Sequence, residues 1–305
     1  MSVTATKPRV GFLGLGWIGR ARFEALASSH LVEIGPVADP LLPESYESLD
    51  ELLEEKLDGI VIATPSALHA EQAIEILQRG VSVFCQKPLG RTAQETRAVV
   101  DAARESDRLL RVDFSYRFAD AFRVAREVVL SGELGETVAG DLVFHNAYGP
   151  DNDWSHDPLL AGGGCLIDLG IHLLDLAVWT FDLEPQLVSS RMLGAPVETF
   201  VTAELDRLRL ACSWNLHAGC AAVIEMSVYG TDGGVSVRNV EGSFYDFRCD
   251  RYRGTHREIL SLPPDDWGGR AIMDWARRLA QSERFDPSAE DYVRVAELVD
   301  RIYRG

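Results

Sequence analysis

The sequence predicts an α/β protein: an N-terminal doubly wound parallel sheet, followed by an α+β region with an open, mostly antiparallel sheet. Two observations carry this prediction. Up to about residue 114, short apolar runs alternate with helical patterns, which is typical of a parallel sheet with crossover helices. After about residue 200, apolar and polar residues alternate with period two, as in antiparallel strands with one covered face.

Length and charge set the first limits on the domain organisation and the partners. A chain of 305 residues is too long for one ordinary core, so we expect two domains, residues 1–117 and 118–305. Hydrophobic residues make up 46% and charged residues 25%, as in soluble globular proteins. The net charge of −17 argues against nucleic acid or an anionic membrane surface as a partner.

The cysteines and apolar stretches indicate a cytoplasmic protein. Five scattered cysteines without CxxC spacing suit reduced thiols, and they predict neither disulfides nor a metal site. The apolar run 10–18 contains three glycines and is flanked by Arg9 and Arg20, so it is interpreted as a strand and turn rather than a signal peptide. No stretch is expected to be long enough to span a bilayer.

The first strand, residues 9–13, leads into a GxGxxG motif and then a helix up to residue 29. Gly14 allows a tight turn, Gly16 lets a pyrophosphate approach the backbone, and Gly19 lets the helix pack closely on the strand. Trp17 and Ile18 fill the variable positions and would lie beside the phosphates, where the helix N-terminus attracts negative charge.

A second strand, residues 31–38, ends in Asp39, which is twenty residues after Gly19. This is the place for a carboxylate that binds the ribose hydroxyls of a dinucleotide. Because a carboxylate there would repel a 2′-phosphate, the sequence predicts NAD in preference to NADP.

The rest of the N-terminal half places several polar residues where buried strands end. Residues 40–46 are too short and proline-rich for a normal crossover helix, and a short acidic helix is expected at 47–55. Thr64, Pro65 and Lys87 follow the strands 57–63 and 81–85, and ligands of such sheets bind at these ends. His69, in the first turn of the next helix, is as readily structural as a cofactor contact. A helix at 92–106 and a strand at 109–114 complete the pattern.

The C-terminal half begins with a helix at 117–130 and a strand at 138–146. A polar and aromatic loop follows, in which Tyr148, Asp153 and Trp154 are candidates for substrate contact. Strands are expected at 208–214 and 224–229, a hairpin turn at 232–234, and helices over 267–304, interrupted near Pro287. Helices would cover one face of this sheet, and self-association would cover the other.

The most informative stretch is the glycine-rich turn at residues 162–164 and the helix that follows. Asp168 and His172 are four residues apart, so on an α-helix they share one face, which Asp175 also joins. A carboxylate and an imidazole on a rigid helix suit proton transfer near neutral pH.

Taken together, these motifs resemble the Gfo/Idh/MocA family, named for glucose–fructose oxidoreductase, inositol dehydrogenase and a rhizopine catabolism protein. The resemblance runs nearly end to end and rests on Gly14–Gly19, Ala63-Thr64-Pro65 with His69, Lys87-Pro88, Tyr116-Arg117, Leu134-Gly135, Gly162–His172, Trp275 and Val293–Tyr303.

The resemblance implies an N-terminal Rossmann domain that binds NAD(P) and a catalytic set of Lys87, Asp168 and His172. It also implies a sugar or polyol substrate and a homodimer or homotetramer built through the C-terminal sheet. Arg117 becomes a candidate for substrate contact, and Gln86 for cofactor contact. Two departures stand out: Gln86 replaces the usual glutamate before Lys87, which removes a negative neighbour, and the helix usually found after Asp39 is missing.

The expected reaction is hydride transfer between the nicotinamide and a secondary alcohol carbon. His172 would be the general base, Lys87 would hydrogen-bond the reacting oxygen, and Asp168 would orient the substrate or the imidazole. One alternative is an enzyme that uses resident NAD in a net non-redox reaction such as glycoside cleavage or elimination. Another is a catalytically silent NAD-binding regulator.

Overall fold

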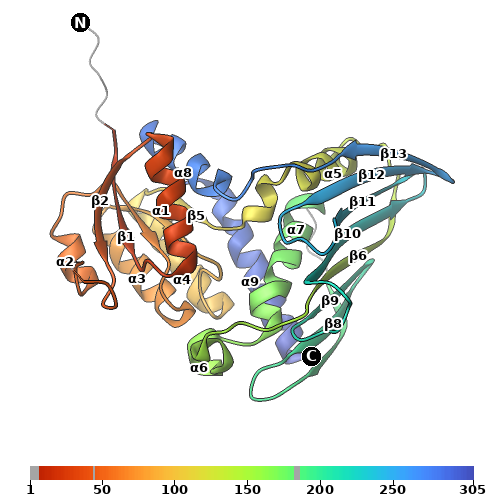
Figure 1. Cartoon of the computed structure of the whole chain (residues 1–305), viewed down its shortest axis with the longest axis horizontal. Helices are drawn as coiled ribbons and strands as arrows, with labels where there is room; N and C mark the ends of the chain where they lie inside the picture. The colour runs from red at the N-terminus through yellow and green to blue at the C-terminus, as the bar shows by residue number, and fades with distance from the viewer. Residues whose placement is uncertain (1–6, 44, 182–185) are drawn as a thin grey trace, which may run out of the picture. The chain divides into compact units, whose positions relative to one another are not determined.

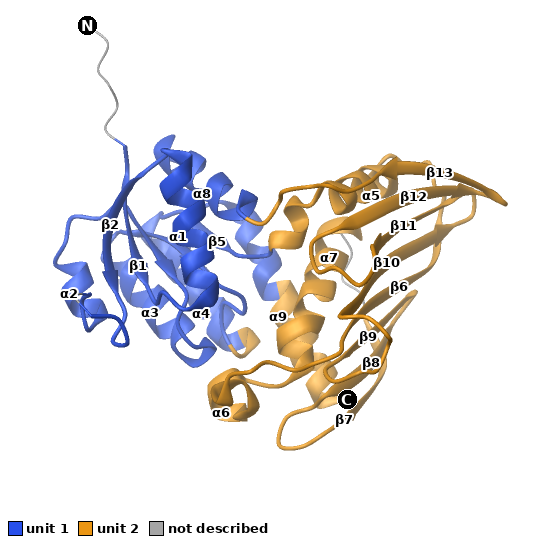
Figure 2. Cartoon of the chain, viewed as in Figure 1, with its two compact units in different colours: residues 1–90, 94–114, 269–293 blue, residues 91–93, 115–268, 294–305 orange. Residues whose placement is uncertain are grey.

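The computed structural model describes residues 7–43, 45–181 and 186–305 (Figure 1). The chain divides into two compact units, neither of which is continuous in sequence (Figure 2). Unit 1 comprises the residues up to Gly90, Gln94–Phe114 and Gly269–Val293. Unit 2 comprises Arg91–Ala93, Ser115–Gly268 and Arg294–Gly305.

Unit 1 contains a parallel sheet of five strands in the order β2-β1-β3-β4-β5, which confirms the predicted doubly wound sheet. Its central strands are almost wholly buried, as their continuous apolar runs predict. The strands are β1 Arg9–Leu13, β2 Glu33–Ala38, β3 Gly59–Ile62, β4 Ser82–Cys85 and β5 Leu110–Val112. The strand order reverses between β1 and β3, so the ligand crevice of this fold is expected beyond their carboxyl ends.

Among its described residues, unit 1 has four helices that alternate with the strands, as predicted, and a fifth that was expected in the C-terminal half. They are α1 Trp17–Ser29, α2 Leu49–Leu53, α3 Ser66–Gln78, α4 Ala93–Ser106 and α8 Arg270–Ala280. The last of these comes from far along the chain and contacts both α1 and β4. Trp275 of α8 is fully buried against Phe84, with ring centroids 5.8 Å apart, and only a glycine at position 59 leaves room for its indole.

Unit 2 is built on an eight-stranded sheet in the order β13-β12-β11-β10-β6-β9-β8-β7. Every neighbouring pair is antiparallel except β6 and β9, so the predicted open and mostly antiparallel sheet is confirmed. The strands are β6 Thr137–Asn146, β7 Leu187–Leu193, β8 Phe200–Leu205, β9 Leu208–Ser213, β10 Ala222–Gly230, β11 Gly234–Asn239, β12 Phe247–Arg253 and β13 His256–Ser261.

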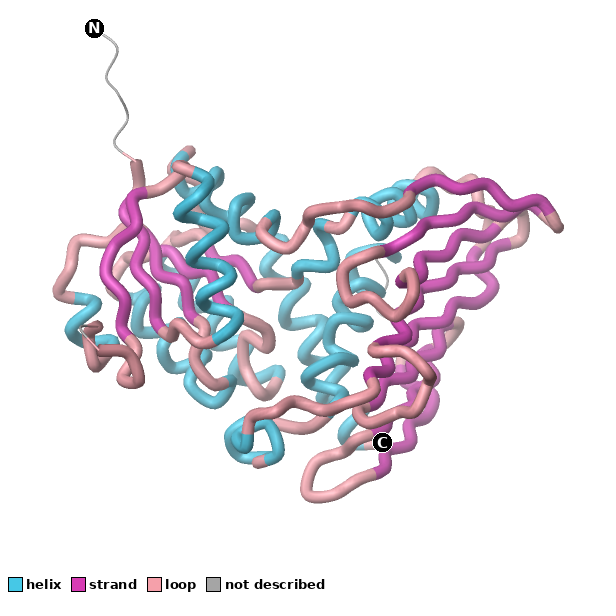
Figure 3. The backbone as a smooth tube through the Cα atoms, viewed as in Figure 1, coloured by secondary structure: helices cyan, strands magenta, loops and turns pink. Residues whose placement is uncertain are grey.

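Helices lie along one face of this sheet (Figure 3). They include α5 Asp120–Leu130, which contacts β11 to β13, and α7 Ile171–Phe181, which contacts β6. The short α6 Pro158–Ala161 precedes the glycine turn, and α9 Glu290–Arg304 runs from unit 1 into unit 2. Leu142 and Phe144 are buried under the helices, whereas Val143 between them is half-buried on the opposite face.

One finding corrects a sequence-based expectation about membranes. Within the described residues, the helical stretch Pro158–Phe181 is long and apolar enough to cross a bilayer by length and composition alone, although no stretch was expected to be. However, 72% of its most apolar window is buried inside the structure, and a core helix of a soluble protein passes the same test.

Four of the five cysteines are buried, and Cys220 is half-buried. All five cysteines are free, and burial raises the pKa of the Cys85 and Cys249 thiols. The described residues contain no group of three or more His, Cys, Asp or Glu side chains that could hold a metal ion.

Candidate active site

The glycine loop after β1 has the geometry that a bound pyrophosphate needs. Gly14 has φ +87°, and a Cβ there would lie 2.7 Å from Ala63 O, so only glycine fits. A Cβ on Gly19 would lie 2.5 Å from Gly14 O, which explains the close packing of α1 on the loop. By contrast, a Cβ on Gly16 would meet no described atom within 4 Å. The open side of the loop is therefore at Gly16.

The N-terminus of α1 begins at this open side. Gly16 is the N-cap, so no capping side chain competes for the N–H groups of the first helical turn. Trp17, the first helical residue, has a 78% exposed side chain, and Ile18 is half-buried. The loop and helix end together fit the phosphates of a dinucleotide.

Asp39 lies directly beside this loop, at the end of β2. Its Oδ2 accepts a hydrogen bond from Leu15 N at 2.7 Å, and its Oδ1 accepts one from Leu41 N at 2.9 Å. The side chain is 9% exposed. The carboxylate is thus fixed against the glycine loop by two backbone donors, where sequence spacing predicted it.

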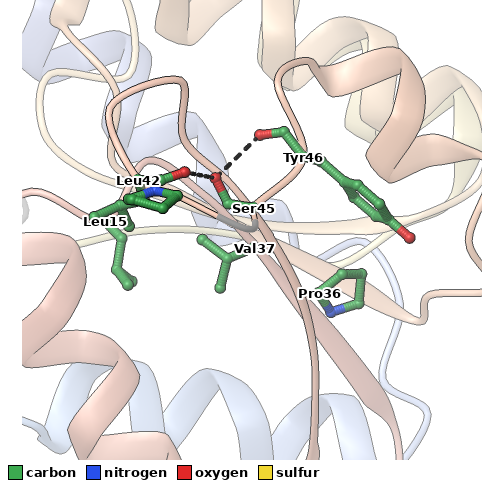
Figure 4. Close-up of a pocket in the computed structure, with 7 residues that line it drawn as sticks. Leu15, Pro36, Val37, Leu42, Ser45 and Tyr46 are labelled. Atoms are coloured by element: carbon green, nitrogen blue, oxygen red, sulfur yellow. Dashed lines mark hydrogen bonds between the residues drawn. The ribbon is translucent and has the colours of Figure 1, made fainter.

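Next to Asp39 is a cavity of about 490 Å³ (Figure 4). It is lined by Leu15, Pro36, Val37, Leu42, Pro43, Ser45 and Tyr46. The segment between β2 and α2 forms much of its wall and is held in place by Ser45 Oγ, which donates to Asp39 O at 2.6 Å. Apart from Ser45 and Tyr46, the residues that line the cavity are apolar.

His69 connects the ends of two neighbouring strands. Its ring is 1% exposed, with Nδ1 2.7 Å from Pro88 O and Nε2 2.7 Å from Thr64 O. Burial lowers the pKa of His69 and outweighs these two carbonyl contacts, which raise it. Thr64 itself donates from Oγ1 to Gln72 at 2.6 Å, and Pro65 is the N-cap of α3. Both ring nitrogens of His69 therefore face the backbone of unit 1.

The segment Gln86-Lys87-Pro88 follows β4. Gln86 is buried, and its amide donates to Asp113 Oδ2. The same carboxylate forms an ion pair with Arg22 of α1, at 2.5 Å from Nε. Lys87 is half-buried at the carboxyl end of the sheet, as predicted.

In unit 2, the glycine turn before Asp168 is held by a carboxylate that the sequence analysis did not identify. Glu198 accepts hydrogen bonds from Gly164 N at 2.9 Å, Leu166 N at 3.0 Å and Tyr303 Oη at 2.8 Å. A Cβ on Gly163 would lie 1.9 Å from Tyr303 Oη, and one on Gly164 would lie 2.0 Å from Glu198 O. Close contact with these two residues explains the two glycines.

Asp168 does not lie on a regular α-helix. Leu166–Gly170 form a π-helical turn, and α7 begins only at Ile171. Such single π turns occur often at functional sites. Trp214, at the end of β9, donates from Nε1 to Asp168 Oδ2 at 3.0 Å. The sequence did not identify this contact, although Trp214 closes the alternating run 208–214.

His172 lies on the first turn of α7 and touches a buried tyrosine. The Tyr116 ring is 5.1 Å from the His172 ring, edge to face, and burial raises the pKa of Tyr116. Tyr116 also contacts Phe144 and Trp267, so His172 lies against an aromatic cluster of unit 2.

Arg117 binds Asp175 of α7 through Nε and Nη2, at 2.9 Å and 2.6 Å, so its guanidinium stabilises the helix that carries His172.

The candidates in the loop after β6 differ in exposure. Tyr148 is 52% exposed, Asp153 is exposed at the start of a 3₁₀ turn, and Trp154 is half-buried. Lys87 belongs to unit 1, whereas Asp168 and His172 belong to unit 2.

Comparison with known proteins agrees with these observations. Residues 8–114 match the family model described as an oxidoreductase family with an NAD-binding Rossmann fold, and residues 122–236 match the GFO/IDH/MocA C-terminal domain. The chain is 28% identical to the rhizopine catabolism protein MocA of Rhizobium meliloti, over 76% of this chain and 79% of that protein. It is also 28% identical to a D-xylose 1-dehydrogenase (NADP⁺) of Haloferax volcanii, over 92% and 88%.

Solved structures show the same fold. A 3-ketoreductase from Actinomadura kijaniata in complex with NADP superposes with a TM-score of 0.85 at 22% identity, over 98% of both chains. Levoglucosan dehydrogenase in complex with NADH gives a TM-score of 0.84 at 20% identity, over 98% of this chain and 96% of that one. With both halves matched by family models, the chain belongs to the GFO/IDH/MocA family and is an NAD(P)-dependent oxidoreductase with a Rossmann domain.

Proposed function

We propose that this oxidoreductase transfers a hydride between the nicotinamide and a secondary hydroxyl of a sugar, polyol or related compound. The observation that carries the proposal is the supported π turn of unit 2, which holds Asp168 next to Trp214 and leads directly to His172. The relatives named above include a D-xylose dehydrogenase and levoglucosan dehydrogenase, which favours a sugar-like substrate for this chain.

The cofactor would be held by unit 1. Gly14, Gly16 and Gly19 with the α1 N-terminus would bind the pyrophosphate, with Trp17 and Ile18 beside it. Asp39 would bind the ribose hydroxyls and the neighbouring cavity the adenine. Thr64, Pro65 and Gln86 would border the nicotinamide end, and His69 would fix the backbone there. When bound, the nicotinamide accepts or supplies the hydride.

Side chains of this protein would carry out the proton transfer that accompanies hydride transfer. His172 would take the hydroxyl proton of the substrate as a general base, and Lys87 would donate a hydrogen bond to the same oxygen as negative charge builds up on it. Asp168, fixed by the indole of Trp214, would orient the substrate or the imidazole. Tyr148, Asp153 and Trp154 remain candidates for binding the rest of the substrate.

The preference for NAD over NADP rests on Asp39. Its carboxylate would lie where the 2′-phosphate of NADP has to sit, and none of the seven described residues that line the cavity is positively charged. Titration of the protein with each cofactor tests this. We expect NAD to bind at least tenfold more tightly, and Asp39→Ser to narrow the difference. Tighter binding of NADP to the unaltered protein would refute the preference.

Turnover of a substrate panel tests the function itself. Sugars, polyols and amino sugars are mixed with NAD, and NADH absorbance is followed for the unaltered protein, Lys87→Ala and the exposed control Lys56→Ala. We expect Lys87→Ala to lower kcat at least a hundredfold with little change in NAD affinity, and Lys56→Ala to stay near wild type. Bound cofactor that never turns over would instead favour a resident-NAD, net non-redox reaction.

We also propose that the protein is cytoplasmic and forms a homodimer or homotetramer through the sheet of unit 2. The face of that sheet away from α5 and α7 carries half-buried residues such as Val143 and Ala211, and no covering element of unit 2 is described there. Neither nucleic acid nor a membrane is proposed as a partner, because the net charge is −17.

A further inference from the structure

A buried polar cluster lies at the carboxyl ends of β4 and β5 in unit 1. Its members are Arg22, Asp113 and Gln86, which are only 8%, 2% and 7% exposed, respectively. They come from three different elements: Arg22 from α1, Gln86 from the residue after β4, and Asp113 from the residue after β5. The sequence analysis attached no role to Arg22 or Asp113.

One carboxylate oxygen connects the three side chains. Asp113 Oδ2 receives the Nε–H of Arg22 at 2.5 Å and also the amide N–H of Gln86. The backbone is joined as well, because Asp113 N donates to Cys85 O at 2.9 Å. Asp113 therefore holds Gln86, directly before Lys87, through its side chain, and Cys85 through its backbone. Its ion pair with Arg22 ties both residues to α1, the helix that follows the glycine loop.

The charges in this cluster depend on the glutamine. The hydrogen bonds of Asp113 Oδ2 join one guanidinium, one carboxylate and one neutral amide. A glutamate at position 86 would bring a second buried carboxylate against the first, and buried like charges are strongly unfavourable. Gln86 thus lets the carboxylate of Asp113 bind an amide instead of facing a second carboxylate.

The turn is fixed on its other side too. Pro88 O, one residue beyond Lys87, lies 2.7 Å from Nδ1 of the buried His69. Lys87 is the half-buried residue between two buried, hydrogen-bonded neighbours. Lys87 is therefore held between two neighbours that are anchored in the core of unit 1.

We propose that Asp113 is a positioning residue for Lys87: its carboxylate holds the segment before Lys87 through Gln86. The cluster keeps the Lys87 turn in register with α1 and hence with the cofactor loop. This inference rests on the role proposed for Lys87 in the reaction.

The chain allows a direct test, because it contains only three lysines: Lys7, Lys56 and Lys87. Lys7 and Lys56 are exposed and serve as internal references. The acylation rate of each amine by an N-hydroxysuccinimide ester is followed by mass spectrometry of the whole folded protein. The variants are Asp113→Asn, Gln86→Glu, and the swap Gln86→Glu with Asp113→Asn. Asp286→Asn is the matched control, since Asp286 pairs with Arg111 of the same strand β5.

We expect Asp113→Asn to raise the ratio of the Lys87 to the Lys56 acylation rate at least threefold, because a released turn exposes the amine of Lys87. The same variant should lower kcat at least tenfold, with a smaller change in KM for NAD. Gln86→Glu alone should lower thermal stability. The double swap should bring the rate ratio and kcat back to within threefold of wild type, and Asp286→Asn should leave the ratio unchanged.

An unchanged rate ratio in folded Asp113→Asn would overturn the proposal. So would a double swap that folds without restoring the ratio, or one that fails to fold. If Asp113→Asn alone does not fold, the Lys87-to-Lys56 rate ratio of the double swap decides whether the proposal holds. Acylation needs no substrate, so it tests the positioning of Lys87 even if no compound in the panel is turned over, which would count against the proposed function only.

Discussion

Trp214 shows how a single hydrogen bond can control the side chain on which a site depends. Its indole N–H is donated to Asp168 at 3.0 Å, and its ring lies 5.7 Å from that of His156 in the loop before the glycine turn. Because the indole is a donor only, it holds one carboxylate oxygen of Asp168 in place.

Trp214→Phe should lower kcat about tenfold while the fold persists. The change keeps most of the ring but removes a hydrogen bond to a charged group, worth about 1.5–3 kcal/mol. Steady-state kinetics and thermal unfolding measure the two effects separately. Trp267→Phe is the control, since it removes a similar indole bond, to Tyr245 O at 2.8 Å, and should keep kcat. Equal kcat values for the two variants would contradict a special role for Trp214.

His69 should make unit 1 less stable in mild acid. Burial, the main cause, and the nearby Lys87 lower the pKa of His69 below 6.5, so the unfolded chain binds a proton at a higher pH than the folded one. Stability from this residue is therefore fully present above pH 6.5 and is lost as the pH falls. Urea unfolding should show that wild type loses about 1 kcal/mol more than His69→Gln between pH 7.5 and 5.5.

The control for this prediction is His256→Gln, which alters an exposed histidine on β13 and should keep the wild-type dependence on pH. Parallel unfolding curves for wild type and His69→Gln at every pH would show that His69 is equally protonated in the folded and unfolded states.

At the scale of elements, the glycine turn before α7 is fixed by residues far away in sequence. Tyr303 comes from α9 and Glu198 from the segment before β8, and both would collide with any side chain at Gly163 or Gly164. Burial and the adjacent Glu198 raise the pKa of Tyr303, so it remains a donor to that carboxylate. The turn, the carboxylate and the tyrosine therefore act as one support for the π turn.

Gly163→Ala should destabilise the protein by about 1–3 kcal/mol, because the new Cβ would lie 1.9 Å from Tyr303 Oη. Adding Tyr303→Phe removes that oxygen and should recover part of the loss, which a double-mutant cycle by chemical denaturation measures. Gly268→Ala is the control, since a Cβ there would meet no described atom within 4 Å. Strictly additive effects would mean that the two residues do not compete for space.

Helices and strands were predicted well where a single hydrophobic periodicity dominates the sequence. The strands and helices of unit 1 lie within a few residues of their predicted bounds, because buried parallel strands and amphipathic helices have distinct patterns. Four strands, β7, β8, β12 and β13, were not predicted. The burial pattern of β7 and of β13 does not alternate cleanly, since they form the two edges of the sheet.

At the scale of the whole molecule, the open face of the unit 2 sheet leads to a prediction about assembly. Ala211 lies on that face, between Val143 and Thr202 of the neighbouring strands. Ala211→Arg should shift the protein towards monomer in sedimentation velocity experiments, because a buried and unpaired charge is costly in an interface. Leu130→Arg, on α5, is the control and should leave the assembly unchanged. A wild-type protein that is already monomeric would refute the proposed oligomer.

The two units also divide the chain in a way that local pattern does not reveal. The passage from unit 1 to unit 2 at Phe114 and Ser115 lies near the proposed boundary at residue 117, but Gly269–Val293 return to unit 1. That return depends on Trp275 filling the space that Gly59 leaves open, a contact between residues more than two hundred positions apart.

The class of fold, the cofactor loop and the candidates Lys87, Asp168 and His172 could be predicted from the sequence, because each depends on local spacing: glycines in a turn, polar residues after buried strands, a carboxylate and an imidazole near a helix start. The residues that support them became apparent only in the folded chain. Asp113, Glu198, Trp214 and Tyr303 act across long sequence separations. Hydrogen bonds and close packing between distant segments leave no periodic trace in the sequence, so only the folded chain brings these partners together.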